Sequence, residues 1–451
     1  MKYLIKRSLF ALILAVSLLC FSQSAWAFCG FYVSKADSKL YNQASQVIIA
    51  RNNQRTILTM ANDYQGEAKD FALVVPVPTI LKKEQVNIGD RQIIERLDAF
   101  SAPRLVEYFD SNPCQIYPES PADSMLRGAN APAPTMKAAR SNEALGVTIE
   151  EKFSVGEYDI LILSAKESNG LATWLNQNDY QIPQGANQVL DAYIKQGLKF
   201  FVAKVNLKEY SRQGFQALRP LMMAYESPKY MLPIRLGMAN AKGPQDLLIY
   251  LLSPQGAAEV TNYRTVKVPS DVEIPEFIKA EFGSFYKAMF KKSYQKAGRN
   301  VIFLEYAWNM ANCDPCSAEP LNPEELKKAG VFWLANGGNP RRGMPFNPNS
   351  NVFITRLHVR YTPDKFPEDL QFQSTANQNS FQGRYVMRHP YTGEMNCSAA
   401  QDYRQQVRKR QEQEAKTLAN LTGWGIDSIR KRMNFMKEES QPWWRSIWPN
   451  R

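Results

Sequence analysis

Histidine is scarce in this chain, since only His358 and His389 occur among 451 residues. Chemistries that need several imidazoles are therefore set aside. The sequence also lacks a Gly-x-Ser-x-Gly elbow, a His-Glu-x-x-His pair, a glycine-rich phosphate loop and an EF-hand loop. We accordingly predict no catalytic residue, no metal site and no cofactor.

A long apolar run is missing after the first 27 residues. Within those residues, a positively charged start precedes an apolar core over residues 9–21, and Ala25-Trp26-Ala27 forms a small-residue cleavage site. The core is shorter than the roughly 18 to 20 residues of a spanning helix. We therefore expect a signal peptide that is cleaved after Ala27 and a periplasmic or secreted product.

The remaining cysteines are few and are expected to form disulfides. Outside the leader the cysteines are Cys29, Cys114, Cys313, Cys316 and Cys397. Disulfides persist in an oxidising compartment, and five thiols allow at most two bridges. The spacing does not specify which cysteines pair.

Two alternatives involve the C-x-x-C pair formed by Cys313 and Cys316. Such a pair at the start of a helix can act as a thiol-disulfide oxidoreductase. Pro320 lies only four residues beyond Cys316, so a long helix cannot begin there. A zinc site that adds Cys29 and Cys397 is the other alternative, but the second C-x-x-C of a zinc ribbon is missing. Structural disulfides are the favoured interpretation.

Alternating apolar residues and turn signals divide the chain into β-rich blocks. We predict strands over residues 46–52, 55–64, 71–78, 147–155, 159–165, 199–207, 218–227, 230–238, 246–254, 301–308 and 353–361. Helices are predicted over 91–100, 103–109, 170–176, 186–196 and 274–296. A short helix with a capping box is predicted to begin at Pro323, between Asn322 and a glycine stop at Gly330.

The domain organisation follows from these patterns. The predicted parts are a signal peptide (1–27), a β-meander with helices (28–116), a flexible linker or insertion (117–144), a second α+β block (145–300), a cysteine-containing closing segment (301–400) and a basic, tryptophan-rich helical tail (401–451). The linker is rich in Pro, Ala and Ser, a composition that buries too little apolar surface to order itself.

The tail combines helical spacing with positive charge and tryptophan. Its apolar residues recur at Ile426, Ile429 and Met433, and its expected contact residues are Arg430, Lys431, Arg432, Trp443, Trp444 and Trp448. Basic amphipathic helices with tryptophan suit an anionic lipid surface. The alternative is that this helix docks on the parent domain.

Four separated segments carry a resemblance to a known family. They are Cys29-Gly30-Phe31, FALVVPVP, NCDPCSAEPLNPEEL and VFITRLHVRYTPDKFPEDLQF. Together they resemble the exported bacterial domain of unknown function family 2330, from about Phe28 to Cys397. The resemblance implies no established activity.

These observations lead to one prediction of fold and function. We expect an α+β protein with two β-rich blocks of mostly antiparallel strands, peripheral helices and a helical C-terminal tail. The formal net charge of +12 includes three positive charges of the leader. For a basic exported protein we expect anionic envelope lipid or another envelope protein as the binding partner, and not nucleic acid. We predict a non-catalytic binding or structural component of the envelope, with thiol-disulfide oxidoreductase as the alternative.

Overall fold

The structure is a computed structural model of the whole chain. The residues that it describes are 31–34, 41–65, 71–115, 147–177, 186–206, 208–209, 218–238, 243–312, 314, 317–334 and 351–437. The predicted signal peptide and the predicted linker at 117–144 lie outside them.

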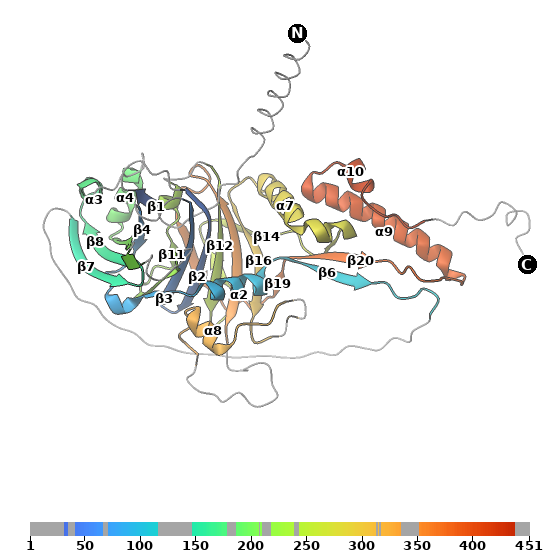
Figure 1. Cartoon of the computed structure of the whole chain (residues 1–451), viewed down its shortest axis with the longest axis horizontal. Coiled ribbons are helices and arrows are strands. Elements are labelled where there is room, and N and C mark those ends of the chain that lie inside the picture. Colours follow the sequence, from blue (N-terminus) through green and yellow to red (C-terminus); the bar gives the residue numbers. More distant parts are fainter. Residues whose placement is uncertain are drawn as a thin grey trace, which may run out of the picture.

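A nine-stranded sheet forms the centre of the molecule (Figure 1). Eight strands follow one path, in the order β14 (Arg264–Lys267), β16 (Val301–Asn309), β17 (Phe353–Tyr361), β12 (Gln245–Ser253), β2 (Tyr41–Asn52), β3 (Arg55–Gln65), β10 (Leu221–Glu226) and β5 (Val86–Ile88). The ninth strand, β19 (Phe381–Gln382), pairs with β16. Neighbours are antiparallel except in the pairs β14/β16 and β12/β2.

A second, five-stranded sheet packs on one face of the first. Its order is β1 (Phe31–Ser34), β4 (Phe71–Val77), β9 (Lys199–Val205), β8 (Tyr158–Ala165) and β7 (Val147–Val155), all antiparallel. The alternation of side chains along each strand explains this packing. In β2, Val47 and Ile49 belong to the core between the sheets, whereas Ile48 and Ala50 face the other side.

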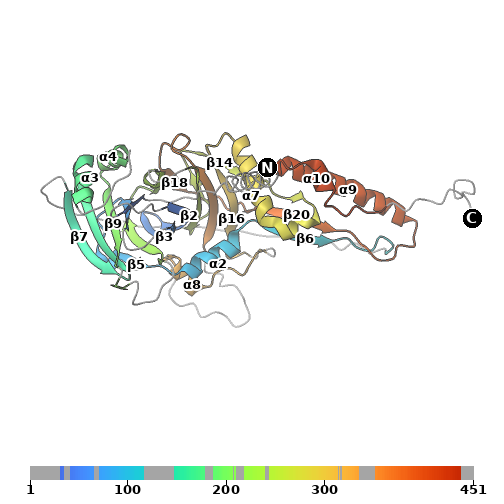
Figure 2. The ribbon, with the colours of Figure 1, turned by 45° about the horizontal axis from the view of Figure 1, so that its top comes forward.

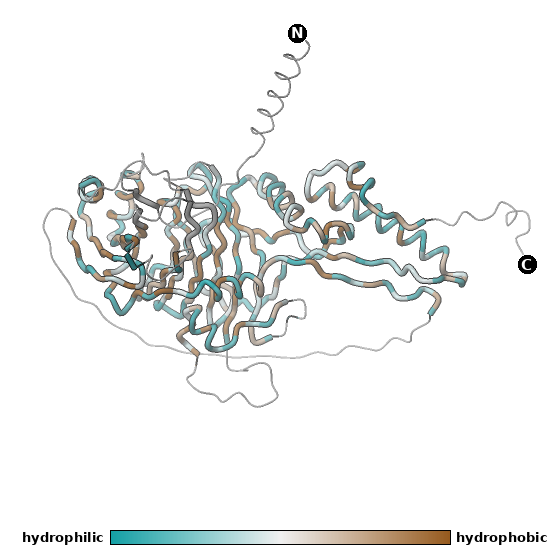
Figure 3. The backbone as a smooth tube through the Cα atoms, viewed as in Figure 1, coloured by the Kyte–Doolittle hydropathy of each residue, from teal (hydrophilic) through white to brown (hydrophobic). Residues whose placement is uncertain are grey.

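Helices cover the two outer faces, so the molecule has four layers. Helices α3 (Ser168–Gln177) and α4 (Ala186–Lys195) pack on the five-stranded sheet, and α2 (Arg91–Ser101) and α8 (Pro323–Lys328) pack on the nine-stranded sheet. Figure 3 shows that the strands between these helices are largely apolar. The predicted α+β fold with mostly antiparallel strands and peripheral helices is confirmed.

An arm extends from this sandwich (Figures 1 and 2). It contains a parallel sheet of β15 (Val272–Glu273), β20 (Arg384–His389) and β6 (Arg104–Phe109). Helices α7 (Phe282–Lys296), α9 (Ala399–Thr422) and α10 (Ile426–Arg430) pack on that sheet around a separate apolar cluster. The helical C-terminal tail is therefore confirmed as part of the fold.

The described residues also form several shorter elements. They are η2 (Lys83–Gln85), α6 (Arg235–Met238), η3 (Glu276–Glu281) and a sheet of β11 (Met231–Leu232), β18 (Leu370–Ser374) and β13 (Ala258–Val260). Among the described residues, no helix combines the length and apolar character that crossing a membrane requires.

Three predicted elements are wrong in type or extent. In place of the helix predicted over 103–109, residues 104–109 form strand β6, because these six residues pair with β20. The predicted strand at 230–238 contains two strand residues and then the short helix α6. The helix predicted over 274–296 is a 3-10 turn followed by α7, and Glu281, the last residue of the turn, has a non-helical conformation.

The short capped helix α8 is confirmed in detail. Asn322 accepts a hydrogen bond from the Glu325 backbone at 2.9 Å, and the Glu325 carboxylate accepts one from the Asn322 backbone at 2.8 Å. Gly330 ends this region with a φ of +94°. A side chain there would collide with Ile57, so the position favours glycine on two grounds.

Candidate functional site

A chain of buried ion pairs crosses the outer face of the nine-stranded sheet. It runs through Asp98, Arg356, Glu305, His358, Asp246 and Arg360, which we call the ion-pair chain. Arg356 donates to Glu305 and to Asp98 at 2.7 and 2.8 Å. His358 lies 2.8 Å from Glu305 through Nδ1 and 3.4 Å from Asp246 through Nε2. Alternation along β17 places its two arginines and its histidine on this face.

The charges of the ion-pair chain stabilise one another. Burial would raise the pKa of Glu305, but the positive charges of His358 and Arg356 outweigh that effect and lower it to about 2. Burial would lower the pKa of His358, but the Glu305 and Asp246 carboxylates raise it to about 9. His358 is therefore charged at neutral pH. A general base must be neutral to accept a proton, so His358 is not in the state that such a base needs at neutral pH.

A second buried arginine has no carboxylate partner among the described residues. Arg51, near the end of β2, is 5% exposed. Its guanidinium group donates to Thr56 Oγ1 at 2.7 Å, to the Ser227 carbonyl at 2.9 Å and to the Lys229 carbonyl at 3.4 Å. Burial lowers its pKa, and the described residues supply no carboxylate to compensate its charge. A guanidinium has five N–H donors, so two remain for another acceptor.

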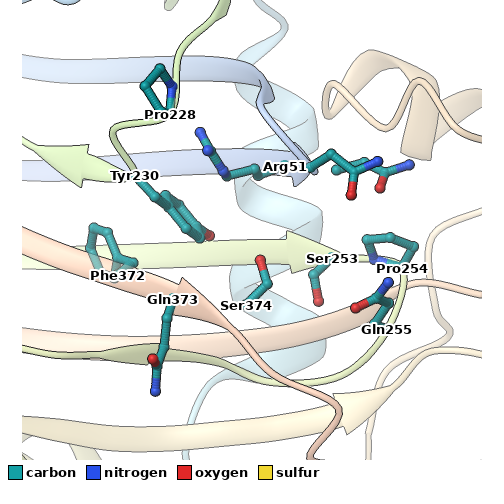
Figure 4. A pocket seen from close by; sticks show the side chains of 11 residues that line it. Arg51, Pro228, Tyr230, Ser253, Pro254, Gln255, Phe372, Gln373 and Ser374 are labelled. Atoms are coloured by element: carbon teal, nitrogen blue, oxygen red, sulfur yellow. The ribbon is translucent and has the colours of Figure 1, made fainter. Parts of the chain in front are cut away.

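Arg51 lines a pocket of about 250 Å³, which we call the Arg51 pocket (Figure 4). The wall comes from the β2/β3 turn, the end of β12, strand β18 and the segment before β11, and comprises Arg51, Asn52, Asn53, Pro228, Tyr230, Ser253, Pro254, Gln255, Phe372, Gln373 and Ser374. Among the described residues of this lining, Arg51 is the one that carries a charge, so this part of the wall is positively charged. Its amide and hydroxyl groups can donate to further oxygen atoms of a ligand.

Tyr230 lies under the guanidinium group of Arg51. The Arg51 Cζ atom is 4.7 Å from the centre of the ring. Figure 4 shows the Tyr230 hydroxyl pointing toward Ser374 and Ser253. This hydroxyl oxygen is buried and has no hydrogen-bond partner among the described residues. Burial raises the pKa of Tyr230, so the hydroxyl keeps its proton and can act as a donor.

Two of the predicted disulfide cysteines form a bridge. Cys114 follows β6 and Cys397 precedes α9, and their Cα atoms are 5.7 Å apart. The bridge closes the arm at the end of its sheet. Cys29, Cys313 and Cys316 lie outside the described residues. Over the residues that are described, no three His, Cys, Asp or Glu side chains form a group that could hold a metal ion.

The described part of the tail packs against the protein. Ile429 of α10 is 1% exposed in the cluster under α9. Arg430 pairs with Glu412, and Arg432 pairs with Glu281. Lys431 is exposed, and Trp443, Trp444 and Trp448 lie outside the described residues.

Sequence reasoning missed Arg51 and Tyr230. The available signal was a single arginine at the end of the otherwise apolar run of β2. That signal does not reveal burial, because an arginine at a strand end usually reaches solvent.

A family model described as "Uncharacterized protein conserved in bacteria (DUF2330)" matches residues 23–373. No curated protein and no solved structure matches the chain.

Proposed function

This chain belongs to the DUF2330 family of uncharacterized bacterial proteins, and we propose that it is an exported, non-catalytic binding component of the cell envelope. In this proposal it is periplasmic or secreted and is cleaved after Ala27. The leader pattern supports export. The Cys114–Cys397 bridge also suits an oxidising compartment.

We propose that binding takes place in the Arg51 pocket and that the bound group is an anion. The observation that carries this proposal is the buried guanidinium of Arg51, for which the described part of the chain supplies no carboxylate partner. An isolated buried charge is costly, and natural proteins pair it or bind a counter-charge. A small anion would accept the two remaining N–H donors and the Tyr230 hydroxyl proton. The same contacts would stabilise the folded state by mass action.

Thermal unfolding in matched salts tests this proposal. Sodium acetate should raise the melting temperature of the wild-type protein relative to sodium chloride at the same ionic strength. Arg51→Met should lose this difference, whereas Arg51→Lys should keep part of it. Arg55→Met is the matched control, because Arg55 lies in the same hairpin, is 68% exposed and pairs with Glu226. An equal acetate effect in wild type and Arg51→Met would contradict the proposal.

A separate experiment tests the alternative function, that of a thiol-disulfide oxidoreductase. If Cys313 and Cys316 form an active dithiol, the protein should catalyse the reduction of insulin disulfides by dithiothreitol, which reduces the Cys313–Cys316 disulfide again after each cycle. Cys313→Ser should abolish this catalysis. The binding proposal expects no turnover in either protein.

A further inference from the structure

The Arg51 pocket lies where the hydrogen-bonded pairing between strands β11 and β18 ends. Strands β11 and β18 are antiparallel, with Met231 opposite Gln371 and Leu232 opposite Leu370. The Phe372 N–H extends this ladder by donating to the Tyr230 carbonyl at 2.8 Å. Continuing the same register places Pro228 opposite Ser374.

The strand that carries Tyr230 leaves the ladder at this point. Pro228 has no N–H to donate. The preceding residue, Ser227, donates to the Gln54 carbonyl in the β2/β3 turn, and its own carbonyl accepts from Arg51. The chain therefore turns away from β18 toward the hairpin, and the pocket occupies the position that the next paired residue would fill.

The main chain of Ser374 faces this opening. On the opposite side of β18, the Gln371 carbonyl accepts from Thr261, and the Thr375 N–H donates to the Ala257 carbonyl. Successive residues of a strand direct their hydrogen-bonding groups to alternate sides. Residues 371, 373 and 375 therefore face β13, and Ser374 directs its N–H and carbonyl toward the Arg51 pocket.

We propose that the pocket binds the C-terminal carboxylate of an extended peptide, whose main chain pairs with the open edge of β18 at Ser374. This inference rests on the proposed function and names its ligand class. Arg51 would bind the carboxylate, and Ser374 would supply the main-chain hydrogen bonds that orient the peptide. Strand addition and carboxylate capture are both established modes of peptide recognition.

The charge and size of the pocket favour this class of ligand. One positive charge balances one carboxylate, whereas a phosphate dianion is usually held by several cations or a cradle of backbone N–H groups. A volume of about 250 Å³ lies below the roughly 300 to 1,000 Å³ of pockets that enclose a drug-sized ligand. The pocket is open to solvent on one side, so it suits the end of a longer chain.

A pair of labelled penta-alanine peptides provides the test. One peptide ends in a free carboxylate and the other in an amide, and fluorescence anisotropy measures the affinity of each for the full-length protein. We expect the acid to bind on the order of tenfold or more tightly than the amide, which corresponds to about 1.4 kcal/mol. Arg51→Met should remove this preference, and Arg55→Met should keep it.

A second variant tests the strand edge. Ser374→Pro removes the N–H that faces the pocket without removing a hydrogen bond to β13. It should weaken binding of the acid peptide on the order of tenfold. Ser374→Ala keeps the N–H and loses only the hydroxyl, so it should weaken binding of the acid peptide less than Ser374→Pro does.

The outcomes separate this inference from the proposed function. Equal affinity for the acid and amide peptides overturns the inference. So does the absence of peptide binding by a protein that acetate still stabilises, and in that case the anion site stands without a peptide ligand. If neither peptide binds and acetate has no effect, both proposals fail.

Discussion

His358 stacks on Phe290 with ring centres 3.8 Å apart and planes inclined by 16°. Phe290 belongs to α7, which lies where the arm joins the nine-stranded sheet, and His358 belongs to β17 in that sheet. The imidazole nitrogens meanwhile face Glu305 and Asp246. One residue thus joins the ion-pair chain of the sandwich to the helix that supports the arm.

The positive charge of His358 between Glu305 and Asp246 predicts that the protein loses stability at alkaline pH. The pKa of His358 is raised to about 9 in the folded protein from an ordinary value of 6.5. The protonated His358 therefore adds its full contribution to the free energy of unfolding below pH 6.5, and this contribution is lost as the pH rises toward 9. We expect the free energy of unfolding in urea to fall by on the order of 3 kcal/mol over this window.

His358→Gln should flatten that dependence. The matched control is His389→Gln, which replaces the other histidine of the chain, at a partly buried ion pair with Glu107, and leaves His358 and its two carboxylate partners in place. If the free energy of unfolding of His358→Gln falls with pH as steeply as that of the wild type, another group causes the pH dependence.

The Cys114–Cys397 bridge should contribute strongly to the stability of the arm. It joins residues 283 positions apart, and the chain-entropy model assigns about 5.6 kcal/mol to the closure of so long a loop. Dithiothreitol should lower the melting temperature of the wild-type protein. The double variant Cys114→Ser/Cys397→Ser should melt lower in the absence of reductant and respond little to it. A melting temperature unaffected by reductant in the wild type would contradict this prediction.

Glu414 of α9 should make the arm sensitive to pH near neutrality. It is 5% exposed, and burial raises its pKa to about 7 despite the opposing charge of Arg410. A carboxyl with a raised pKa favours the folded state when protonated, so stability should fall as the pH rises from about 4.5 to 7. Glu414→Gln should remove this dependence and stabilise the protein at pH 8 in urea unfolding. Destabilisation at pH 8 would show that the ionised Glu414–Arg410 pair is net favourable.

The tryptophans of the tail remain proposed contacts with an anionic lipid surface. Replacing Trp443, Trp444 and Trp448 together by alanine should reduce sedimentation with phosphatidylglycerol vesicles at low salt. Arg430→Ala should instead destabilise the fold, because Arg430 pairs with Glu412. If the triple variant sediments as wild type does, the tail makes no lipid contact.

Local sequence signals predicted most elements but not their pairing. The alternation in β2 and β3 and the capping box of α8 depend on neighbours in sequence, and both appear as expected. The order of strands depends on contacts between distant residues, such as the parallel pairing of β12 with β2. Strand β6 was mistaken for a helix for the same reason, since its partner β20 lies some 280 residues away along the chain.

The candidate site was less predictable than the fold. Arg51 is recognised as a buried cation only in the folded structure, where its guanidinium donates to the Ser227 and Lys229 carbonyls. Neither residue is near Arg51 in sequence. The cysteines were visible in the sequence, but the choice of Cys397 as the partner of Cys114 depends on how the arm folds. Tyr230 gave no signal, since an unsatisfied hydroxyl is a property of packing and not of sequence.

The most direct test of the account is a crystal structure of the wild-type protein soaked in sodium 4-bromobenzoate. The bromine atom gives an anomalous signal that locates the ligand without reference to the protein. We expect a bromine peak in the Arg51 pocket, with the carboxylate oxygens within hydrogen-bonding distance of the Arg51 guanidinium. A pocket without bromine, in a crystal that binds the carboxylate at other arginines, would contradict it.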